Sequence, residues 1–549
     1  MIVGSNAMIK HIPLACALLA LLLGPIFLRP RTEHAAKAGE QELVIITPHN
    51  EAIRGEFARA FAAWYQAKTG ERVHVDWRTP GGTSEIARYV ASEYLSSFKR
   101  YWQESPNRAW STTVEQNFDN PKITLNPAPA KDTPEQQARR AFLDSNVGCG
   151  IDLFFGGGSF DFSQQAAAGR LVDCGVVAAH PELFNNHVIP KELGGEPYWD
   201  AQGRWIGVCL ASFGICSNTD SLARLGIPEI PKRWADLANP LLFHEVALAN
   251  PTQSGSVNRA FELLIQQQIL ETVEARKATS GAATLTPEDE ADAIRSGWAR
   301  AMRLLMKIGA NARYFTDSSS KVSLDVAAGE AAAGMTIDFY GRVESEAVRR
   351  PDGTSRLQFV NAQRGTTFSA DPIGLLRGAP NPKLAKEFIE WSISPEGQKL
   401  WNWKVGTPGG PTRYALRRLP ILPALYAPEF RQFRSDPDVN PYATAGEFTY
   451  HSAWTAPLFR PIAFIVRIMC IDPHEELTDA WHALIEANYP PQAMEVFSNV
   501  DAVSYDEAKG RIRNVFGPIR ISEVQLAKEL ADHFRAQYRH AAELARAGK

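Results

Sequence analysis

The chain has 549 residues, of which 45% are hydrophobic and 22% are charged, so most of it is expected to be globular and to form two to four domains. Its net charge is −3 and it has no long basic block, which disfavours nucleic acid as a partner. The motifs Gly-x-Ser-x-Gly, His-Glu-x-x-His and Cys-x-x-Cys are absent from the sequence, which disfavours a hydrolase, a zinc protease and a dithiol site.

The N-terminal sequence is typical of an export signal. Lys10 and His11 form a short basic head before the apolar run at residues 12–28, and a polar stretch follows. Residues 36–38, Ala-Lys-Ala, are a candidate cleavage site. The competing interpretation is an uncleaved membrane anchor formed by residues 12–28. Both interpretations predict an exported, periplasmic or otherwise extracytoplasmic protein.

Five cysteines follow this segment, and their spacing matches no metal site. An odd number leaves at least one thiol free unless two chains pair, and most of the five are expected to be small buried side chains. They are Cys149, Cys174, Cys209, Cys216 and Cys470.

Strands and helices alternate after residue 40. Residues 42–47 are a nearly continuous apolar strand, residues 51–68 have a helical apolar face, and residues 73–77 are a second strand. A Gly-Gly-Thr-Ser turn at residues 81–84 leads into a helix over residues 85–98. This alternation predicts a mostly parallel open sheet flanked by helices.

The alternation stops at residues 99–144, which are rich in Asn, Pro, Gln and Lys and are interpreted as an inserted surface segment with a helix at residues 134–144. It resumes with a strand over residues 151–155 and, after a Gly-rich turn, a helix over residues 162–168. Residues 205–217 are a long apolar stretch with two glycines, which is expected to cross between two lobes.

A second lobe is expected to follow. Its predicted strands are residues 246–249, 331–339 and 357–360, with helices after Ser256 and over residues 284–308. Residues 368–376 are the expected return crossing, and helices follow over residues 383–392 and 397–403. Beyond residue 411 the chain is expected to be irregular, then helical from residue 452, with a last helix from residue 522.

The predicted fold class is therefore α/β, with two lobes, each a mostly parallel sheet flanked by helices, crossing strands as the hinge, and a helical C-terminal extension. The expected divisions are a signal or anchor (1–38), lobe 1 (39–210, with the insertion 99–144), lobe 2 (211–365), a return to lobe 1 (366–413) and the extension (414–549).

Polar turns recur at the ends of the predicted strands. In an open parallel sheet, ligands bind outside the carboxyl ends of the strands, and helix N-termini there offer free N–H groups to an anion without any Lys or Arg. The sequence therefore predicts a ligand site formed by His49, Asn50, Gly82, Thr83, Ser84, Gly158, Ser159, Thr252, Ser254, Gly255, Ser256, Asp338 and Tyr340. Residues 316–321 are interpreted as a solvated loop, and the turn at residues 156–159 lacks the Lys of a P-loop.

These features together resemble the bacterial extracellular solute-binding proteins of ABC transporters, in the branch of ferric-ion, phosphonate and sugar-phosphate binders. The most specific residues are Ser369-Ala-Asp-Pro-Ile-Gly-Leu-Leu376, Asn381-Pro-Lys-Leu-Ala-Lys-Glu-Phe388 and Ser394-Pro-Glu-Gly-Gln-Lys-Leu-Trp401. The resemblance covers about residues 42–413 and leaves the insertion and the extension unexplained.

The resemblance implies a solute held between two lobes and delivered to a membrane permease by a monomeric binding protein that needs no cofactor and does no chemistry. In ferric binders a histidine after the first strand and a Tyr-Tyr pair hold the metal; His49 matches the histidine, but the pair aligns with Phe339-Tyr340. The hydroxyl and glycine turns instead resemble those of members that bind anions. The prediction is a small anionic, for example phosphorylated, organic solute.

Three alternatives stay open at this point. The first is a ferric-ion binder that uses His49 and Tyr340, the second is a ligand-sensing module, and the third, which the sequence favours least, is an exported hydrolase.

Overall fold

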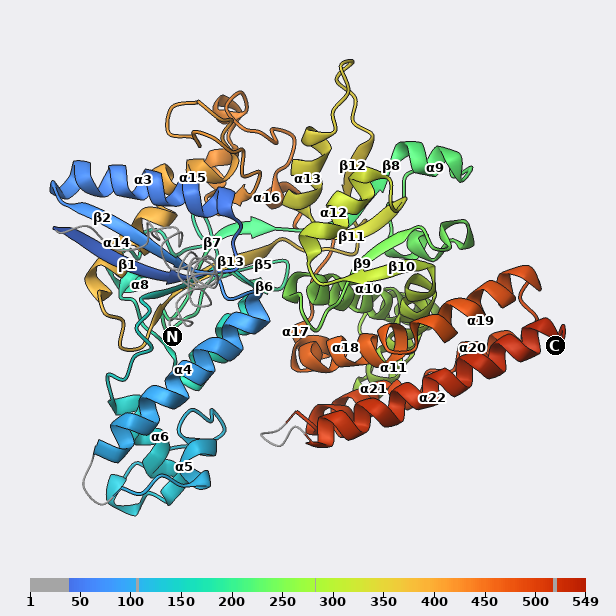
Figure 1. The fold of residues 1–549 in the computed structure, drawn as a ribbon, viewed down its shortest axis with the longest axis horizontal. Coiled ribbons are helices and arrows are strands. Elements are labelled where there is room, and N and C mark those ends of the chain that lie inside the picture. The colour runs from blue at the N-terminus through green and yellow to red at the C-terminus, as the bar shows by residue number, and fades with distance from the viewer. Residues whose placement is uncertain (1–38, 105–107, 282, 517–520) are drawn as a thin grey trace, which may run out of the picture.

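The computed structural model describes residues 39–104, 108–281, 283–516 and 521–549. The predicted export signal or anchor at residues 1–38 lies outside the described residues. Figure 1 shows two sheet-containing halves, one with β1 and β2 and the other with β8 to β12, and a group of C-terminal helices beneath the second half. The predicted α/β fold class with two lobes is confirmed.

The first lobe contains a seven-stranded sheet with the order β14-β7-β13-β3-β1-β2, and β4 also pairs with β13. Its strands are β1 (Glu40–Ile46), β2 (Arg72–Arg78), β3 (Leu153–Phe155), β4 (Leu171–Val172), β7 (Ile206–Ala211), β13 (Ser369–Leu376) and β14 (Leu419–Pro420). A two-stranded hairpin, β5 (Glu192–Leu193) and β6 (Glu196–Pro197), stands beside it.

The second lobe contains a five-stranded sheet with the order β10-β9-β11-β8-β12. Its strands are β8 (Phe213–Asn218), β9 (Val246–Ala249), β10 (Ala312–Thr316), β11 (Ala333–Ile337) and β12 (Leu357–Asn361). The chain enters this lobe between β7 and β8, with only Ser212 between them, and returns between β12 and β13.

Both sheets are mixed rather than mostly parallel. β1 pairs in parallel with β2 and β3, and β9 pairs in parallel with β10 and β11. The strands next to the crossings, β7, β8, β12 and β13, pair antiparallel with their neighbours, because the chain passes through each lobe in both directions.

Helices cover both sheets. In the first lobe they are α3 (Glu51–Thr69), α4 (Thr83–Glu104), α5 (Thr112–Asn117), α6 (Pro134–Asp144), α7 (Ser159–Ala168), α8 (Val176–Ala179), α14 (Pro382–Ile393) and α15 (Pro395–Asn402). In the second they are α9 (Thr219–Arg224), α10 (Gly255–Ser280), α11 (Pro287–Asn311), α12 (Ser319–Ala328) and α13 (Asp338–Ala347).

The inserted segment is more ordered than its composition predicts. Helix α4 continues to Glu104, beyond the predicted end at residue 98, and it carries α5 and α6 at its far end (Figure 1). Phe98 stacks on Phe118 at 4.8 Å between ring centroids, and Phe142 packs edge-on against both rings. These rings belong to the part of the first-lobe core that also contains Val44 and Phe154, so the insertion packs into that lobe.

The C-terminal extension belongs to the cores of both lobes. Leu416, Leu419 and Ile421 pack into the core of the first lobe, whereas residues from Phe448 onward pack into the core of the second. Its helices are α16 (Pro441–Thr444), α17 (Ser452–Thr455), α18 (Phe459–Val466), α19 (His474–Glu486), α20 (Pro491–Phe497), α21 (Tyr505–Glu507) and α22 (Ile521–Arg546). The chain thus passes between the lobes a third time, between residues 442 and 448.

One stretch of the described residues, Ser452–Ile471, is long and apolar enough to cross a membrane. However, 72% of its most apolar window is buried inside the protein, and its residues Ile462, Phe464 and Ile465 belong to the core of the second lobe. This burial is typical of a core helix of a globular protein.

Candidate functional site

A cavity of about 450 Å³ lies at the carboxyl ends of strands from both sheets. The first lobe contributes the turns after β1, β2 and β3, and the second contributes the turns after β9, β10 and β11. Because the two sheets face each other across this cavity, it occupies the position where open α/β sheets bind ligands.

Four helices of ten or more residues begin at the cavity wall. They are α4, which starts at Thr83, α7 at Ser159, α10 at Gly255 and α12 at Ser319, and each of these residues lines the cavity. Asn50, the N-cap of α3, lies there as well. The unpaired N–H groups and the positive dipole ends of these helices therefore meet at one place.

The structure brings ten of the thirteen sequence-predicted site residues together around the cavity. These are His49, Asn50, Gly82, Thr83, Gly158, Ser159, Ser254, Gly255, Ser256 and Tyr340. That they contact a solute stays a prediction.

The other three predicted residues do not line the cavity. Ser84 follows the first residue of α4, and the Thr252 hydroxyl donates to Asn250 Oδ1 at 2.7 Å inside its own turn. Asp338 is fully buried, and its carboxylate lies 2.9 Å from the Arg342 guanidinium. The predicted strand at residues 331–339 ends at Ile337, so Asp338 opens α13 and is not among the residues that line the cavity.

The hydroxyl-rich segment after β10 differs from its interpretation as a solvated loop. Asp317, Ser318 and Ser319 line the cavity, and Ser319 begins α12. The sequence reasoning missed β10, which carries this turn to the cavity, because Ala312–Thr316 alternates polar and apolar residues only weakly.

Two glycines allow the first-lobe turns to approach each other closely. Gly156 and Gly157 have φ values of 93° and 129°, which side-chain-bearing residues rarely adopt. A Cβ on Gly157 would lie 2.5 Å from Thr83 Cγ2, and one on Gly156 would lie 2.6 Å from the His49 ring. The turn after β3 therefore packs directly on the turns after β1 and β2.

A buried polar group forms the first-lobe side of the cavity. Asp371, on the return strand β13, accepts from the Gly157 backbone N–H, lies 3.3 Å from His49 Nε2 and pairs with the Arg418 guanidinium. The side chains of His49, Asp371 and Arg418 are each at most 6% exposed. One carboxylate thus has three partners from three separate parts of the chain.

The environment sets the charges of this group. Burial lowers the pKa of His49, so its ring is neutral at neutral pH, with Asp371 opposing the shift. Burial alone would raise the pKa of Asp371, but the Arg418 charge and the His49 hydrogen bond hold it below its usual value. Asp371 is therefore ionised and paired with a charged Arg418.

The expectation of a site without Lys or Arg is wrong, because two arginines, Arg418 and Arg259, line the cavity. Arg418 lies in a stretch with no helical or strand period, far from Asp371 in sequence, so no local pattern marks it. The one sequence signal is Asp371 itself, a carboxylate inside an otherwise apolar strand that requires a buried partner.

Arg259 lies at the border between the lobes. It pairs with Glu196 of the first lobe and with Glu262 of its own helix α10, and its guanidinium lies 4.0 Å from the Tyr450 ring centroid. Thr367, on the return crossing, donates to Glu196 Oε1. Because two carboxylates already neutralise Arg259, we assign it to holding the lobes together at the base of the cavity.

Three acidic residues also line the cavity. Glu85 and Asp317 are exposed at its rim, and Glu85 accepts from the Gly82 backbone N–H at 3.0 Å. Asp161, in the first turn of α7, has no such donor, and burial raises its pKa to about 6, with Arg460 opposing the shift.

The site offers binding groups rather than a recognisable catalytic set. Among the residues that the structure describes, no group of three or more His, Cys, Asp or Glu side chains could hold a metal ion. Cys209 is the thiol near Asp371, at 3.9 Å, and burial raises its pKa well above the usual value, which leaves it protonated. The five described cysteines are all free.

Comparisons with known proteins agree with this picture. Residues 151–416 match the family model described as bacterial extracellular solute-binding protein. An uncharacterized protein of Haemophilus influenzae is 29% identical over 256 residues, which are 46% of this chain and 61% of that relative, so the chain spans less than two thirds of the relative's length.

Solved structures with a similar arrangement include periplasmic binding proteins. The periplasmic binding protein AfuA from Actinobacillus pleuropneumoniae, with fructose-6-phosphate bound, is 19% identical, with a TM-score of 0.40 over 65% of this chain and 81% of that one. Iron-bound HitA from Pseudomonas aeruginosa is 15% identical, with a TM-score of 0.45 over 78% and 99%. The substrate-binding protein of an ABC transporter from Agrobacterium tumefaciens is 13% identical, with a TM-score of 0.47 over 79% and 96%.

The family match begins at β3 and ends two residues before Arg418, so it includes the second sheet, both expected crossings and the return helices α14 and α15. The strands β1 and β2 precede it but pair with β3 in one sheet. Residues 151–416, just under half of the chain, thus match the bacterial extracellular solute-binding protein family that the sequence resembles.

Proposed function

We propose that the protein is an extracytoplasmic solute-binding protein of an ABC importer, which holds a small anionic organic solute between its lobes and delivers it to a membrane permease. The observation that carries this proposal is the convergence of the α4, α7, α10 and α12 N-termini on one cavity. An anion there would accept from several backbone N–H groups and hydroxyls, each contributing on the order of 1 kcal/mol. Several such bonds together support roughly micromolar affinity.

A phosphorylated solute fits this cavity in size and chemistry. A volume of about 450 Å³ accommodates a small sugar phosphate or a comparable metabolite. Its phosphate would lie among the helix N-termini, and its neutral part would meet the hydroxyls of Ser256 and Ser318 and the ring of Phe213.

Ferric ion is the weaker candidate. Phe339 stands where a second phenol ligand would be needed, and burial raises the pKa of Tyr340, which opposes formation of a phenolate. His49 Nε2 is engaged by Asp371, and the buried positive charge of Arg418 would repel a cation. Each of these features is compatible with an anion.

Transport without chemistry accounts for the described site better than hydrolysis does. The cavity carries hydroxyls at helix N-termini, but none of its described hydroxyls is hydrogen-bonded to His49. An activated nucleophile requires such a neighbouring base. We therefore assign the serines and threonines to binding.

The double substitution Thr83→Ala with Ser254→Ala tests the assignment of the two facing turns. It is expected to weaken binding of the solute that co-purifies with the native protein, identified by mass spectrometry, at least tenfold, which is about 1.4 kcal/mol. Isothermal titration of the stripped protein measures the change.

The structure also identifies a control for this experiment. Ser254 caps α10 by accepting from Val257 N at 3.4 Å, so its loss costs about 1 kcal/mol of folding stability. Ser394 caps α15 in the same way, accepting from Gly397 N at 3.4 Å, and it lies outside the cavity. Ser394→Ala should therefore lower folding stability similarly and leave the affinity for the solute unchanged. Equal affinities in the wild type, the Thr83/Ser254 double variant and Ser394→Ala would contradict the proposal.

A further inference from the structure

The C-terminal extension delivers a buried cation to the solute cavity. Arg418 directly precedes β14, the short strand that pairs antiparallel with β7 at the edge of the first sheet. Its residue is 3% exposed and lines the cavity, although it lies outside residues 151–416, which match the solute-binding family. A long cationic side chain is buried at such a place only when its surroundings stabilise the charge.

The backbone of Arg418 is held on both sides. Its N–H donates to Trp401 O at 2.9 Å, and its carbonyl accepts from Asn402 Nδ2 at 3.0 Å. The preceding residue, Arg417, has φ = 53°, a left-handed conformation that is unfavourable for a residue with a long side chain. A strained residue persists where the surrounding structure enforces it, and such residues cluster at ligand sites.

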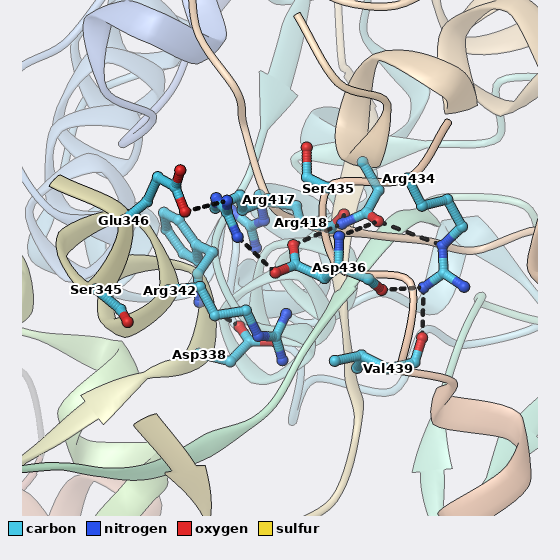
Figure 2. Close-up of polar contacts among 12 residues, drawn as sticks. Asp338, Arg342, Ser345, Glu346, Arg417, Arg418, Arg434, Ser435, Asp436 and Val439 are labelled. Carbon is cyan, nitrogen blue, oxygen red and sulfur yellow. Dashed lines mark hydrogen bonds and ion pairs between the residues drawn. The ribbon is translucent and has the colours of Figure 1, made fainter. Parts of the chain in front are cut away.

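Figure 2 shows the contacts that enforce this conformation. The Arg417 guanidinium lies 2.7 Å from Asp436 Oδ1 and 3.2 Å from Glu346 Oε2, so it links the extension to α13 of the second lobe. Arg434 donates to the backbone carbonyls of Asp436 and Val439, which fixes the loop that carries Asp436. This polar network, whose members do not line the cavity, thus holds the backbone that carries Arg418.

The side chain of Arg418 spans the border between the lobes. Its guanidinium lies 4.4 Å from the ring centroid of Phe339 on α13 and 5.7 Å from that of Trp401. It contacts Asp371 through Nη2, whereas Nε has no hydrogen-bond partner among the residues that the structure describes. A guanidinium has five N–H donors, so this contact uses only part of its capacity.

Two carboxylates, Asp371 and Asp338, act on the charge of Arg418, and each has a donor besides it, since Asp338 pairs with Arg342. Arg418 is therefore able to accept a further anionic partner. Asp371 already receives the Gly157 N–H and lies against His49 Nε2, so its negative charge is shared among several donors. His49 is neutral because burial lowers its pKa. Beside the positive ends of the α4 and α7 dipoles, an incoming carboxylate or phosphate would therefore be attracted rather than repelled.

We propose that Arg418 is a solute-contact residue, which binds the anionic group of the solute and makes the C-terminal extension part of the binding site. This inference rests on the proposed function and adds to it the charged group that selects anions over neutral solutes. Asp371 is the positioning residue, because it holds the guanidinium at the cavity wall while no solute is bound. Phe459, also from the extension, packs on Phe160 at 4.5 Å between ring centroids and closes another side of the same cavity.

The test removes the ion pair without leaving a buried charge. The variant Arg418→Gln with Asp371→Asn keeps hydrogen-bonding side chains of similar shape, and a neutral replacement of a whole buried pair often preserves stability. The matched control is Arg204→Gln with Asp200→Asn, an ion pair of the same lobe with a 2.7 Å contact that lies outside the cavity. Affinities for fructose 6-phosphate, inorganic phosphate and citrate are measured by isothermal titration on the stripped full-length protein.

The expected result is at least a tenfold loss of affinity in the Arg418/Asp371 variant and no change in the Arg204/Asp200 variant. Asp371→Asn alone is measured beside the double variant, because it removes a negative charge and keeps an acceptor for the Gly157 N–H. A loss of anion affinity that the double variant shows and Asp371→Asn alone does not show comes from the missing Arg418. If the double variant does not fold, Arg418→Lys is used instead. This variant keeps the positive charge but loses the planar, two-pronged donor geometry of the guanidinium, so it is expected to bind the anionic probes several-fold more weakly.

Two results would overturn the inference, and they differ from each other. Tight binding by the wild type with unchanged affinity in the Arg418/Asp371 or Arg418→Lys variant would refute the role of Arg418 and leave the proposed function standing. Failure of all three probes to bind the wild-type protein below about 100 µM would refute the anionic solute class and this inference with it.

Discussion

Asp161 is a carboxyl group at the wall of a cavity that we propose to bind anions. Its pKa is raised to about 6 because the surrounding protein removes water from this half-buried carboxyl group, and Arg460 offsets only part of this cost. In the unfolded chain an aspartate has a pKa of about 3.9. The folded protein therefore keeps this proton over a pH range in which the unfolded chain has lost it.

This difference predicts how Asp161→Asn changes stability with pH. As the pH rises from about 4 to about 6, the unfolded state binds fewer protons at this position than the folded state does, so the titration of Asp161 lowers the stability of the wild-type protein by up to about 3 kcal/mol. The asparagine variant does not titrate. Relative to the wild type, it should thus be more stable at pH 7.5 than at pH 4, as measured by urea unfolding of the ligand-free protein. A stability difference that is the same at both pH values would contradict the assignment.

The sequence predicted individual site residues less completely than it predicted helices and strands. His49, Thr83 and Ser254 could be predicted because each follows an apolar strand or precedes a helix, which is a local pattern. The Asp371–Arg418 pair joins residues 47 positions apart in sequence (418 − 371), one of them in an irregular segment. Only the packing of β14 against β7 brings that segment back to the sheet.

At the scale of elements, strand–turn–helix units were predicted well, because apolar periodicity and capping residues are local signals. The strand predicted over residues 246–249 is β9, and the return strand and the two following helices agree with β13, α14 and α15 to within a few residues. The helix predicted from residue 85 begins at Thr83 instead. This shift places its first N–H groups at the cavity, where a turn had been expected.

The close packing of the turn after β3 predicts that a side chain at Gly157 is not tolerated. Gly157→Ala should destabilise the protein by a few kcal/mol and weaken solute binding, because φ = 129° is unfavourable for alanine and its Cβ would clash with Thr83. The Gly157 N–H that holds Asp371 would also move. Thermal unfolding and titration with the co-purified solute measure the two effects.

Gly158 supplies the stability control. It has φ = −106° and no atom within 4 Å of a Cβ built on it, so Gly158→Ala should leave the midpoint of thermal unfolding nearly unchanged. Equal midpoints for the two variants would show that the close approach of the turns is not required.

At the scale of the whole molecule, the C-terminal extension forms part of the core of the second lobe. Helices α18 and α19 pack against α10 and α11, and Ile465, Met469 and Leu484 are fully buried in the core of the second lobe. The sequence predicted helices here but not their partners, because amphipathic helices reveal an apolar face and not the surface that covers it.

A chain that ends at residue 442 should therefore not retain a stable second lobe. Its α10 and α11 would expose the apolar surface that α18, α19 and α22 cover in the full chain. We expect it to bind 8-anilinonaphthalene-1-sulfonate and to lose the cooperative thermal transition of the full-length protein. A truncated protein with an unchanged transition and no dye binding would show that the extension is an independent appendage.

The three passages of the chain between the lobes also bear on how a ligand can be assigned. The third passage comes after the residues that the family match covers, and the same segment places Arg418 and Phe459 at the cavity. The family match covers neither side chain, so a substrate inferred from that match alone would leave both out of account. Identification of the solute should accordingly start from metabolite screens on the intact polypeptide.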